Sequence, residues 1–262
     1  MFCGFDDDLT QEITQVSNRI RGLLTQIHPA LERVLGPRLD HPALLALLQK
    51  YPSPRVLSAV SETRLAVFLA RPAPRLAKTL AVKIHRALHE QTVVVPGTRA
   101  AELVLPRLAE QLATLRRQRE ELAREVERRV KAHPLAPVLI SMPGVGVRTA
   151  ARLLTEVTTR PFGFSAHPAA YAGLASVTRR SGSSIRGEHP SRPGNKVLKR
   201  ALFLSAFAAL SDTVFRAYYE RKIQQGKRQN QAHIPLARWR CDVLYAIPRY
   251  GSLCHATPTI NA

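Results

Sequence analysis

The fold of this chain is decided by residues 99–132, which read RAAELVLPRLAEQLATLRRQREELAREVERRVKA. Apolar side chains recur in this stretch at steps of three and four residues; they are Leu105, Leu108, Leu112, Leu115, Leu122 and Val126. Such spacing places them on one face of a long helix whose other faces carry Arg and Glu. The pattern predicts a helix from about Arg99 to Ala132. Its apolar seam packs either on another helix of the same chain or on a second protomer, and the sequence leaves both alternatives open.

The residues before this helix also have helical patterns. Residues 6–35 repeat apolar side chains at helical spacing, and residues 41–90 alternate short helical patterns with proline breaks. The first of these helices is the natural partner for the seam within one chain. We therefore interpret residues 1–132 as a helical arm with a coiled-coil or dimerisation region.

The character of the chain changes after His133-Pro134, and residues 137–250 are interpreted as a compact basic domain followed by a tail, residues 251–262. An apolar segment leads through Met142-Pro143-Gly144-Val145-Gly146 into a second helical pattern, which is typical of a helix-hairpin-helix. In that element the backbone N–H groups of a glycine-rich turn bind a phosphate at a helix N-terminus. Arg148 and Arg152, one turn apart, favour this interpretation over an ordinary turn, which remains possible. No clear strand pattern is present, so the predicted fold class is all-α.

Composition limits the function classes. The chain has 39 Lys and Arg against 19 Asp and Glu, a formal charge of +20. Most of this excess lies after residue 130, and nucleic acid is the commonest partner of so basic a surface. An acidic protein, a membrane surface or basic composition without function are the alternatives. Three widely spaced cysteines indicate neither a metal site nor disulfides, and no apolar run approaches the length of a membrane span. The chain is expected to be cytoplasmic.

Residues 175–195 form a long segment without an apolar pattern, and it contains Ser181-Gly182-Ser183-Ser184-Ile185-Arg186-Gly187. A serine beside a glycine can approach a phosphodiester closely, and Arg179, Arg180 and Arg186 can bind the phosphate oxygens. Serine needs activation to act as a nucleophile, and Glu188 and His189, which lie nearby in the sequence, are the candidates for an activating base. On the residues alone, a phosphate-binding or flexible loop is favoured over a catalytic one.

Four motifs in order resemble the C-terminal domain of the insertion-sequence-110 family of transposases. They are SMPGVG at 141–146, YAGL at 171–174, SGSSIRG at 181–187 and GNKVLKRAL at 194–202. The segment from Gly4 onward is similar to the helical region of these proteins that mediates dimer contacts. The resemblance therefore covers nearly the whole chain.

The resemblance implies a role in DNA transposition. In that family a structured guide RNA directs recombination, and the nucleophile is the serine immediately before Gly-Ser-Ser, which corresponds to Ser181. The partners implied are DNA, guide RNA and a second copy of the chain bound through the helical arms. The residues expected at the nucleic acid are Gly144, Gly146, Arg148, Arg152, Arg179, Arg180, Gly182, Ser183, Ser184, Arg186, Asn195, Lys196, Lys199 and Arg200.

The chain departs from the family in one respect. Family members also have a RuvC-like domain in which four acidic residues hold magnesium, and that domain is expected before Met1. No cofactor or metal site is expected in this chain itself, and little turnover is expected from the chain alone. Prolines such as Pro235 and Pro248 predict a kinked or broken last helix. These departures suggest a fragmentary copy, so the alternative is a non-catalytic nucleic-acid-binding or dimerising fragment of a decayed element.

Overall fold

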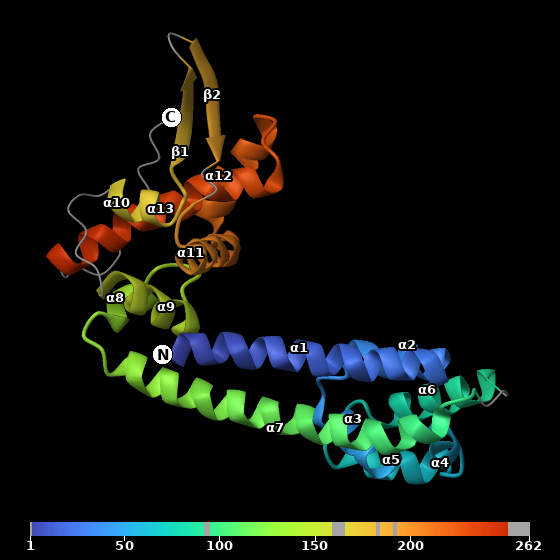
Figure 1. The fold of residues 1–262 in the computed structure, drawn as a ribbon. Coiled ribbons are helices and arrows are strands. Elements are labelled where there is room, and N and C mark those ends of the chain that lie inside the picture. The colour runs from blue at the N-terminus through green and yellow to red at the C-terminus, as the bar shows by residue number, and fades with distance from the viewer. Residues whose placement is uncertain (1, 92–94, 159–165, 182–183, 191–192, 251–262) are drawn as a thin grey trace. The chain divides into compact units, whose positions relative to one another are not determined.

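The computed structural model describes residues 2–91, 95–158, 166–181, 184–190 and 193–250. Its elements cluster into two compact units, Met1–Leu122 and Ala123–Ala262. The predicted long helix is present as α7 (Thr98–Lys131), and the division between the units falls inside it. Figure 1 shows the elements of both units.

The first unit is entirely helical over its described residues. Besides the first part of α7 it contains α1 (Phe2–Ile27), α2 (Pro29–Leu35), the 3₁₀ turn η1 (Gly36–Arg38), α3 (Pro42–Lys50), α4 (Pro54–Ser58), α5 (Glu62–Ala70) and α6 (Ala77–Glu90). Helices α2, α3 and α4 each begin with a proline, whose missing N–H costs nothing at a first helical position. The residue before each proline, His28, His41 or Ser53, accepts a hydrogen bond from a backbone N–H of the first turn.

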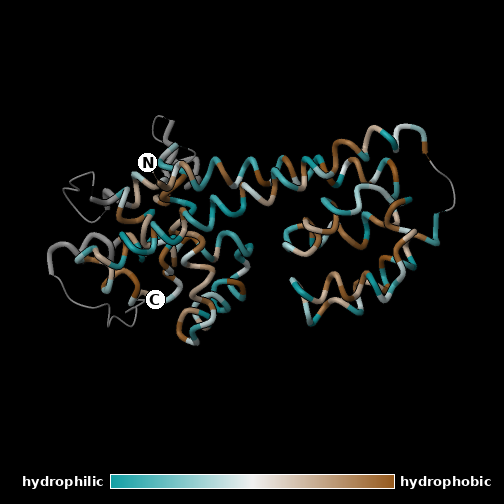
Figure 2. Tube along the Cα trace, turned by 90° about the horizontal axis from the view of Figure 1, so that it is seen from below, coloured by the Kyte–Doolittle hydropathy of each residue, from teal (hydrophilic) through white to brown (hydrophobic). Residues whose placement is uncertain are grey.

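The seam of α7 packs inside the chain. It buries Ala101, Leu105, Ala109, Leu112 and Leu115 in the same apolar cluster that takes in Val16, Ile20, Leu24 and Ile27 of α1. The two helices run side by side in opposite directions (Figure 1), and hydrophilic and hydrophobic residues alternate along them (Figure 2). An ion pair of 2.8 Å between Arg119 Nε and Asp6 Oδ1 joins the start of α1 to α7. As far as Leu115, the seam is therefore buried within the chain, in the core that the helices of the first unit share.

The second unit is built around one central helix. Its elements are α8 (Ala136–Ile140), α9 (Val147–Thr158), α10 (Ala166–Tyr171), β1 (Ser176–Ser181), β2 (Ser184–Pro190), α11 (Lys196–Ala208), the 3₁₀ turn η2 (Ala209–Ser211), α12 (Thr213–Gln224) and α13 (Gln229–Tyr250). Helix α11 packs on both α9 and α13. Its buried residues Leu198, Ala201, Leu202, Ser205 and Ala206 repeat at three and four residues, as a core-facing helix requires.

The all-α prediction is confirmed for the scaffold, but residues 176–190 require a correction. They form an antiparallel β-hairpin where the sequence predicted a loop. Two paired strands satisfy their backbone hydrogen bonds on each other, so a hairpin needs no helical apolar period to form. The overlooked signal is the two-residue Gly-Ser connection at 182–183, which is typical of tight hairpins.

The last helix is a second correction. The prolines were expected to kink or break it, and the predicted break is wrong, because α13 runs from Gln229 to Tyr250 with Pro235 and Pro248 inside. Pro235 lies in the second turn, where its missing N–H removes one hydrogen bond, the one to the carbonyl of the exposed residue Gln231. The predicted helix-hairpin-helix is not established, because α8 has only five residues. Among the described helices, none combines the length and apolar character that crossing a bilayer demands.

Candidate nucleic-acid interface and serine hairpin

Ser181 is the last residue of β1, at the end of the hairpin farthest from its base. It pairs with Ser184, so that Gly182 and Ser183, which lie outside the described residues, connect the strands. The register pairs Thr178 with Glu188 and Arg180 with Ile185. Two residues of β2 therefore face one residue of β1 between these pairs, which is a β-bulge.

The bulge places three arginines that were predicted to contact nucleic acid close together along the hairpin. Arg179 of β1 lies opposite Arg186 and Gly187 of β2, and Arg180 directly precedes Ser181. The hairpin thus gathers Ser181, Ser184 and the three arginines at one end of a single element. Serine and arginine are residue types suited to binding a phosphodiester.

The segment that leads into β1 (the entry leg) and the segment that follows β2 (the exit leg) meet at two glycines. Gly173, with φ +67°, precedes β1, and Gly194, with φ +121°, follows β2. A Cβ atom on Gly194 would lie 2.7 Å from the backbone nitrogen of Gly173, so no larger residue fits there. The N–H of Asn195 donates to the carbonyl of Tyr171 at 2.7 Å and closes the base.

A polar network surrounds this base. The side-chain amide of Asn195 donates from Nδ2 to Glu156 Oε2 at 2.5 Å and to the hydroxyl of Tyr171 at 2.7 Å. The Tyr171 hydroxyl donates to the same Glu156 oxygen at 3.3 Å. Asn195 Oδ1 accepts from the N–H of Leu198 at 2.9 Å, which caps α11. One asparagine therefore ties α9, the end of α10 and the start of α11 together.

Lys199 adds a further contact from α11. Its Nζ donates to the carbonyl of Gly173 at 3.0 Å, one residue before the leg that leads into β1. Asn195 and Lys199 were predicted at the nucleic acid, and the structure gives both of them partners within the protein. A contact of either residue with nucleic acid remains a prediction.

The glycine turn before α9 is held against α11. Gly144 has φ +80°, and a Cβ atom there would lie 2.6 Å from the backbone nitrogen of Ala209. Gly146, two residues on, is exposed and has no neighbour within 4 Å of such an atom. Gly144 is therefore needed for close packing, whereas Gly146 stands open at the start of α9.

Arg240 of α13 is hydrogen-bonded to this turn. It is fully buried, and its Nη2 donates to the carbonyl of Pro143 at 2.7 Å and to that of Ser205 at 3.1 Å. Its guanidinium also lies 5.3 Å from the centre of the Phe215 ring. Sequence reasoning missed Arg240, because nothing in its local pattern distinguishes it from the exposed Arg238 two residues earlier.

The positive charge is concentrated in the second unit. Residues 123–262 carry 22 Lys and Arg against 7 Asp and Glu, an excess of 15 out of the total of 20. Arg148, Lys196 and Arg200 are exposed, and Arg152 is half-buried. Arg148 and Arg152 lie on α9, whereas Lys196 and Arg200 lie on the first turns of α11, next to the hairpin base.

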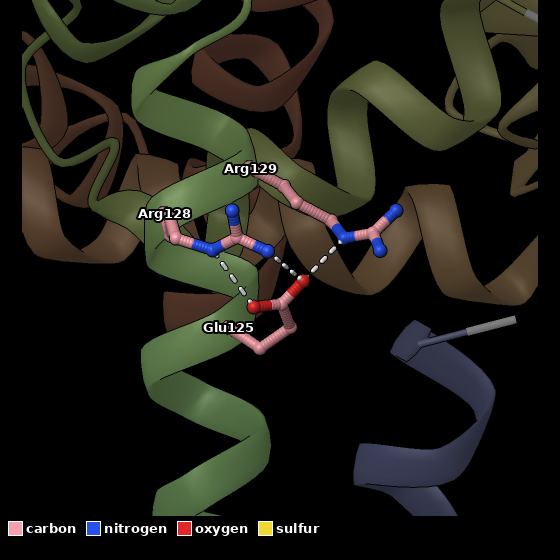
Figure 3. Close-up of polar contacts among 3 residues, drawn as sticks. All are labelled: Glu125, Arg128 and Arg129. Atoms are coloured by element: carbon pink, nitrogen blue, oxygen red, sulfur yellow. Dashed lines mark hydrogen bonds and ion pairs between the residues drawn. The ribbon is translucent and has the colours of Figure 1, made fainter.

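The end of α7 contrasts with this surface, because nearby carboxylates neutralise part of its positive charge. Arg128 and Arg129 donate hydrogen bonds of 2.7 to 2.9 Å to the carboxylate of Glu125 (Figure 3). The bond from Arg129, and next that from Arg128, lowers the pKa of Glu125. Lys131 pairs in the same way with Glu127 at 2.7 Å. This stretch therefore offers less free charge than its arginine content suggests.

Magnesium, which the family resemblance implies for another domain, has no evident place here. The described residues contain no group of three or more His, Cys, Asp or Glu side chains able to hold a metal ion. The residues present thus do not fit a magnesium site.

Comparison with known proteins shows which proteins this chain resembles. The model of the transposase IS116/IS110/IS902 family matches residues 136–220, from α8 into α12 and so across the whole hairpin. The chain is 53% identical over 251 residues to a 43.6 kDa protein of insertion element IS110 from Streptomyces coelicolor, covering 95% of this chain and 62% of that protein.

Two further relatives are more distant. A 42 kDa protein of insertion element IS900 from Mycobacterium paratuberculosis is 34% identical over 97% of this chain, and a 44.8 kDa protein of insertion element IS116 from Streptomyces clavuligerus is 33% identical over 97%. The chain spans 62 to 64% of the length of these three relatives. On these matches, the chain is similar to the IS116/IS110/IS902 family of transposases over residues 136–220, and to proteins of insertion elements IS110, IS900 and IS116 over nearly its whole length.

Proposed function

We propose that this chain takes part in DNA transposition, with its second unit bound to the DNA backbone and Ser181 acting as the nucleophile. The observation that carries the proposal is the position of Ser181 at the end of a β-hairpin, beside Arg180 and near Arg179 and Arg186 in the register. This hairpin lies within the region that the family model matches. The excess of 15 positive charges in residues 123–262 supports a polyanionic partner.

The proposed reaction is a transesterification. Ser181 Oγ attacks the phosphorus of a DNA phosphodiester, a new Oγ–P bond forms, and the bond from phosphorus to one deoxyribose oxygen breaks. The serine loses its proton and the displaced oxygen takes one up, so that no net proton is consumed. Arg180 and Arg186 stabilise the negative charge that builds on the phosphate oxygens. The product is DNA joined covalently to serine, ready for exchange with another strand.

Guide RNA and a second copy of the chain are the further partners proposed. They rest on the family resemblance, and the whole activity needs the acidic domain that the resemblance implies. Binding to DNA or structured RNA, in contrast, is proposed for this chain by itself. Each phosphate contact should steepen the fall of log affinity with log salt by about 0.9 on duplex DNA.

Covalent chemistry is tested by supplying the chain with an intact acidic domain of a relative and its guide RNA. A labelled DNA duplex is added, and protein–DNA adducts are detected on a denaturing gel. Ser181→Ala should abolish the adduct and Ser183→Ala should weaken it. Ser176→Ala, at the other end of β1, is the matched control and should leave the adduct intact. An adduct that persists in Ser181→Ala would rule out this serine as the nucleophile.

Binding is tested on the full chain with a fluorescent duplex over a series of salt concentrations. Arg148→Gln and Arg200→Gln should each reduce the slope of log affinity against log salt by about one unit. Arg64→Gln, an exposed site on α5 in the first unit, is the control and should leave the slope unchanged. An affinity independent of salt would refute nucleic-acid binding. Salt-dependent binding without any adduct would instead favour the non-catalytic fragment.

A further inference from the structure

We infer that Glu156, Tyr171 and Asn195 are positioning residues that set the direction of the serine hairpin. The inference rests on the proposed function, because it gives the network its purpose in placing Ser181. It starts from the fact that a two-stranded hairpin is only marginally stable by itself. Contacts at its base are therefore suited to fix its orientation.

A small tilt at the base of the hairpin causes a large displacement of Ser181 at its other end. Ser181 lies five residues along β1 from Ser176, which is about 17 Å at the rise of an antiparallel strand. A tilt of about 10° at the base would move Ser181 by roughly 3 Å, whereas a reactive group must be held within about 0.5 Å of its productive position. Small losses of order at the base are therefore magnified at the nucleophile.

The network is suited to prevent such a tilt because it joins three helices to both legs. Asn195 follows the exit leg, and its Nδ2 donates to Glu156 of α9 at 2.5 Å. Tyr171 precedes the entry leg and receives the second Nδ2 hydrogen at 2.7 Å. Both legs are thus bound to one carboxylate on a helix outside the hairpin. Lys199 holds the entry leg from α11 through the carbonyl of Gly173.

The identity of residue 195 separates positioning from simple helix capping. Aspartate caps a helix about as well as asparagine does, because its oxygen also accepts the backbone N–H. Aspartate at 195 cannot donate to Glu156, however, and would place a second negative charge against it. Asn195→Asp therefore keeps the cap of α11 and removes the tie to α9.

The first readout is amide hydrogen exchange on the full chain, which does not depend on activity. In Asn195→Asp, the amides of β1 and β2 should exchange about tenfold faster or more, since a charge-assisted bond is lost at their anchor. Amides in the centre of α11, around Leu202, should be unchanged. Unchanged exchange in the hairpin would overturn the inference and leave the assignment of Ser181 untouched.

Rescue provides the second readout. In the double variant Glu156→Gln with Asn195→Asp, the amide and the carboxylate exchange places. The new glutamine can donate to the new aspartate, which still caps α11. This variant should restore the slow exchange of the hairpin amides. Fast exchange in both the single and the double variant would overturn the inference, because it would indicate general destabilisation.

The third readout uses the adduct assay described above. Asn195→Asp should slow adduct formation at saturating DNA by about tenfold or more while the dissociation constant for DNA stays unchanged, because only the placement of Ser181 is affected. The double variant should recover the rate. An equal loss of affinity and rate would overturn the positioning role. If Ser181→Ala still forms the adduct, the proposed function fails, and the exchange experiment still decides whether the network orders the hairpin.

Discussion

Replacing Arg240 by methionine should destabilise the second unit by about 2–4 kcal/mol. The side chain is fully buried, and methionine keeps most of its apolar stem while removing the guanidinium. The carbonyl of Pro143 then loses its donor, and an acceptor left unsatisfied inside the protein costs about 1–3 kcal/mol. The carbonyl of Ser205 loses one of two donors, because the N–H of Ala209 also donates to it. The stacking of the guanidinium on Phe215, worth up to about 2 kcal/mol, is also lost.

An opposing effect must be weighed, because burying a cation is itself costly. Replacement of a whole buried ion pair by apolar residues is often neutral or stabilising. Here the bonded partners are backbone carbonyls, which stay behind in the variant and cannot be replaced. The loss of their hydrogen bonds should therefore exceed the desolvation that methionine relieves.

The measurement is urea unfolding followed by the fluorescence of Trp239. It is the chain's single tryptophan, and its ring lies 5.6 Å from that of Phe215, so it reports on the second unit. At about 2–4 °C per kcal/mol, the melting temperature should fall by roughly 5–15 °C.

Arg238→Met is the matched control. Arg238 is an exposed arginine of the same helix, and its replacement should change stability by less than about 0.5 kcal/mol. If Arg240→Met unfolds at the same or a higher urea concentration than the wild type, the reasoning is refuted and desolvation dominates.

Three further predictions concern stability. Leu112→Ala, at a fully buried position of the α7 seam, should lower the free energy of unfolding by about 2–5 kcal/mol in chemical unfolding. Leu103→Ala, at a residue 68% exposed on the same helix, should change it little. Equal effects would refute packing of the seam within the chain. Gly144→Ala should lower the melting temperature because of its φ of +80° and the nearby Ala209 backbone, and Gly146→Ala should not. Burial lowers the pKa of His28, so its neutral form stabilises the folded state above the ordinary pKa of 6.5, and this contribution is lost as pH falls through the lowered value. His28→Asn, which still caps α2, should flatten that part of the stability–pH curve; an unchanged curve would exclude His28 as the cause.

The sequence predictions that were confirmed rested on the spacing of apolar residues along short stretches of the chain. The steps of three and four residues in the stretch 99–132 predicted α7 within a residue or two, because helical periodicity is a property of neighbours along the chain. The predictions drawn from proline and glycine were wrong where the effect of these residues depends on their position in a helix or between strands. Pro235 does not end α13. Gly182 and Ser183 were predicted to be part of a loop, whereas they connect two paired strands.

The candidate site was predicted only in part. Ser181 and the three arginines near it follow from a contiguous motif, and the structure gathers them on one hairpin. The residues that hold that hairpin could not be assigned in the same way. Tyr171 and Asn195 stood within motifs, but their common partner Glu156 carries no local mark of its role.

The sequence by itself determined the helical scaffold, the basic second half and the family resemblance, since these depend on composition, short-range periodicity and contiguous motifs. Only the tertiary structure decided that the seam of α7 is buried in the core of the first unit, that Asn195 reaches Glu156 across 39 residues, and that Arg240 reaches Pro143 across 97. The physical reason is that a long-range hydrogen bond or packing contact depends on which elements meet. That choice is made by the whole core at once, and no local pattern in a single chain records it.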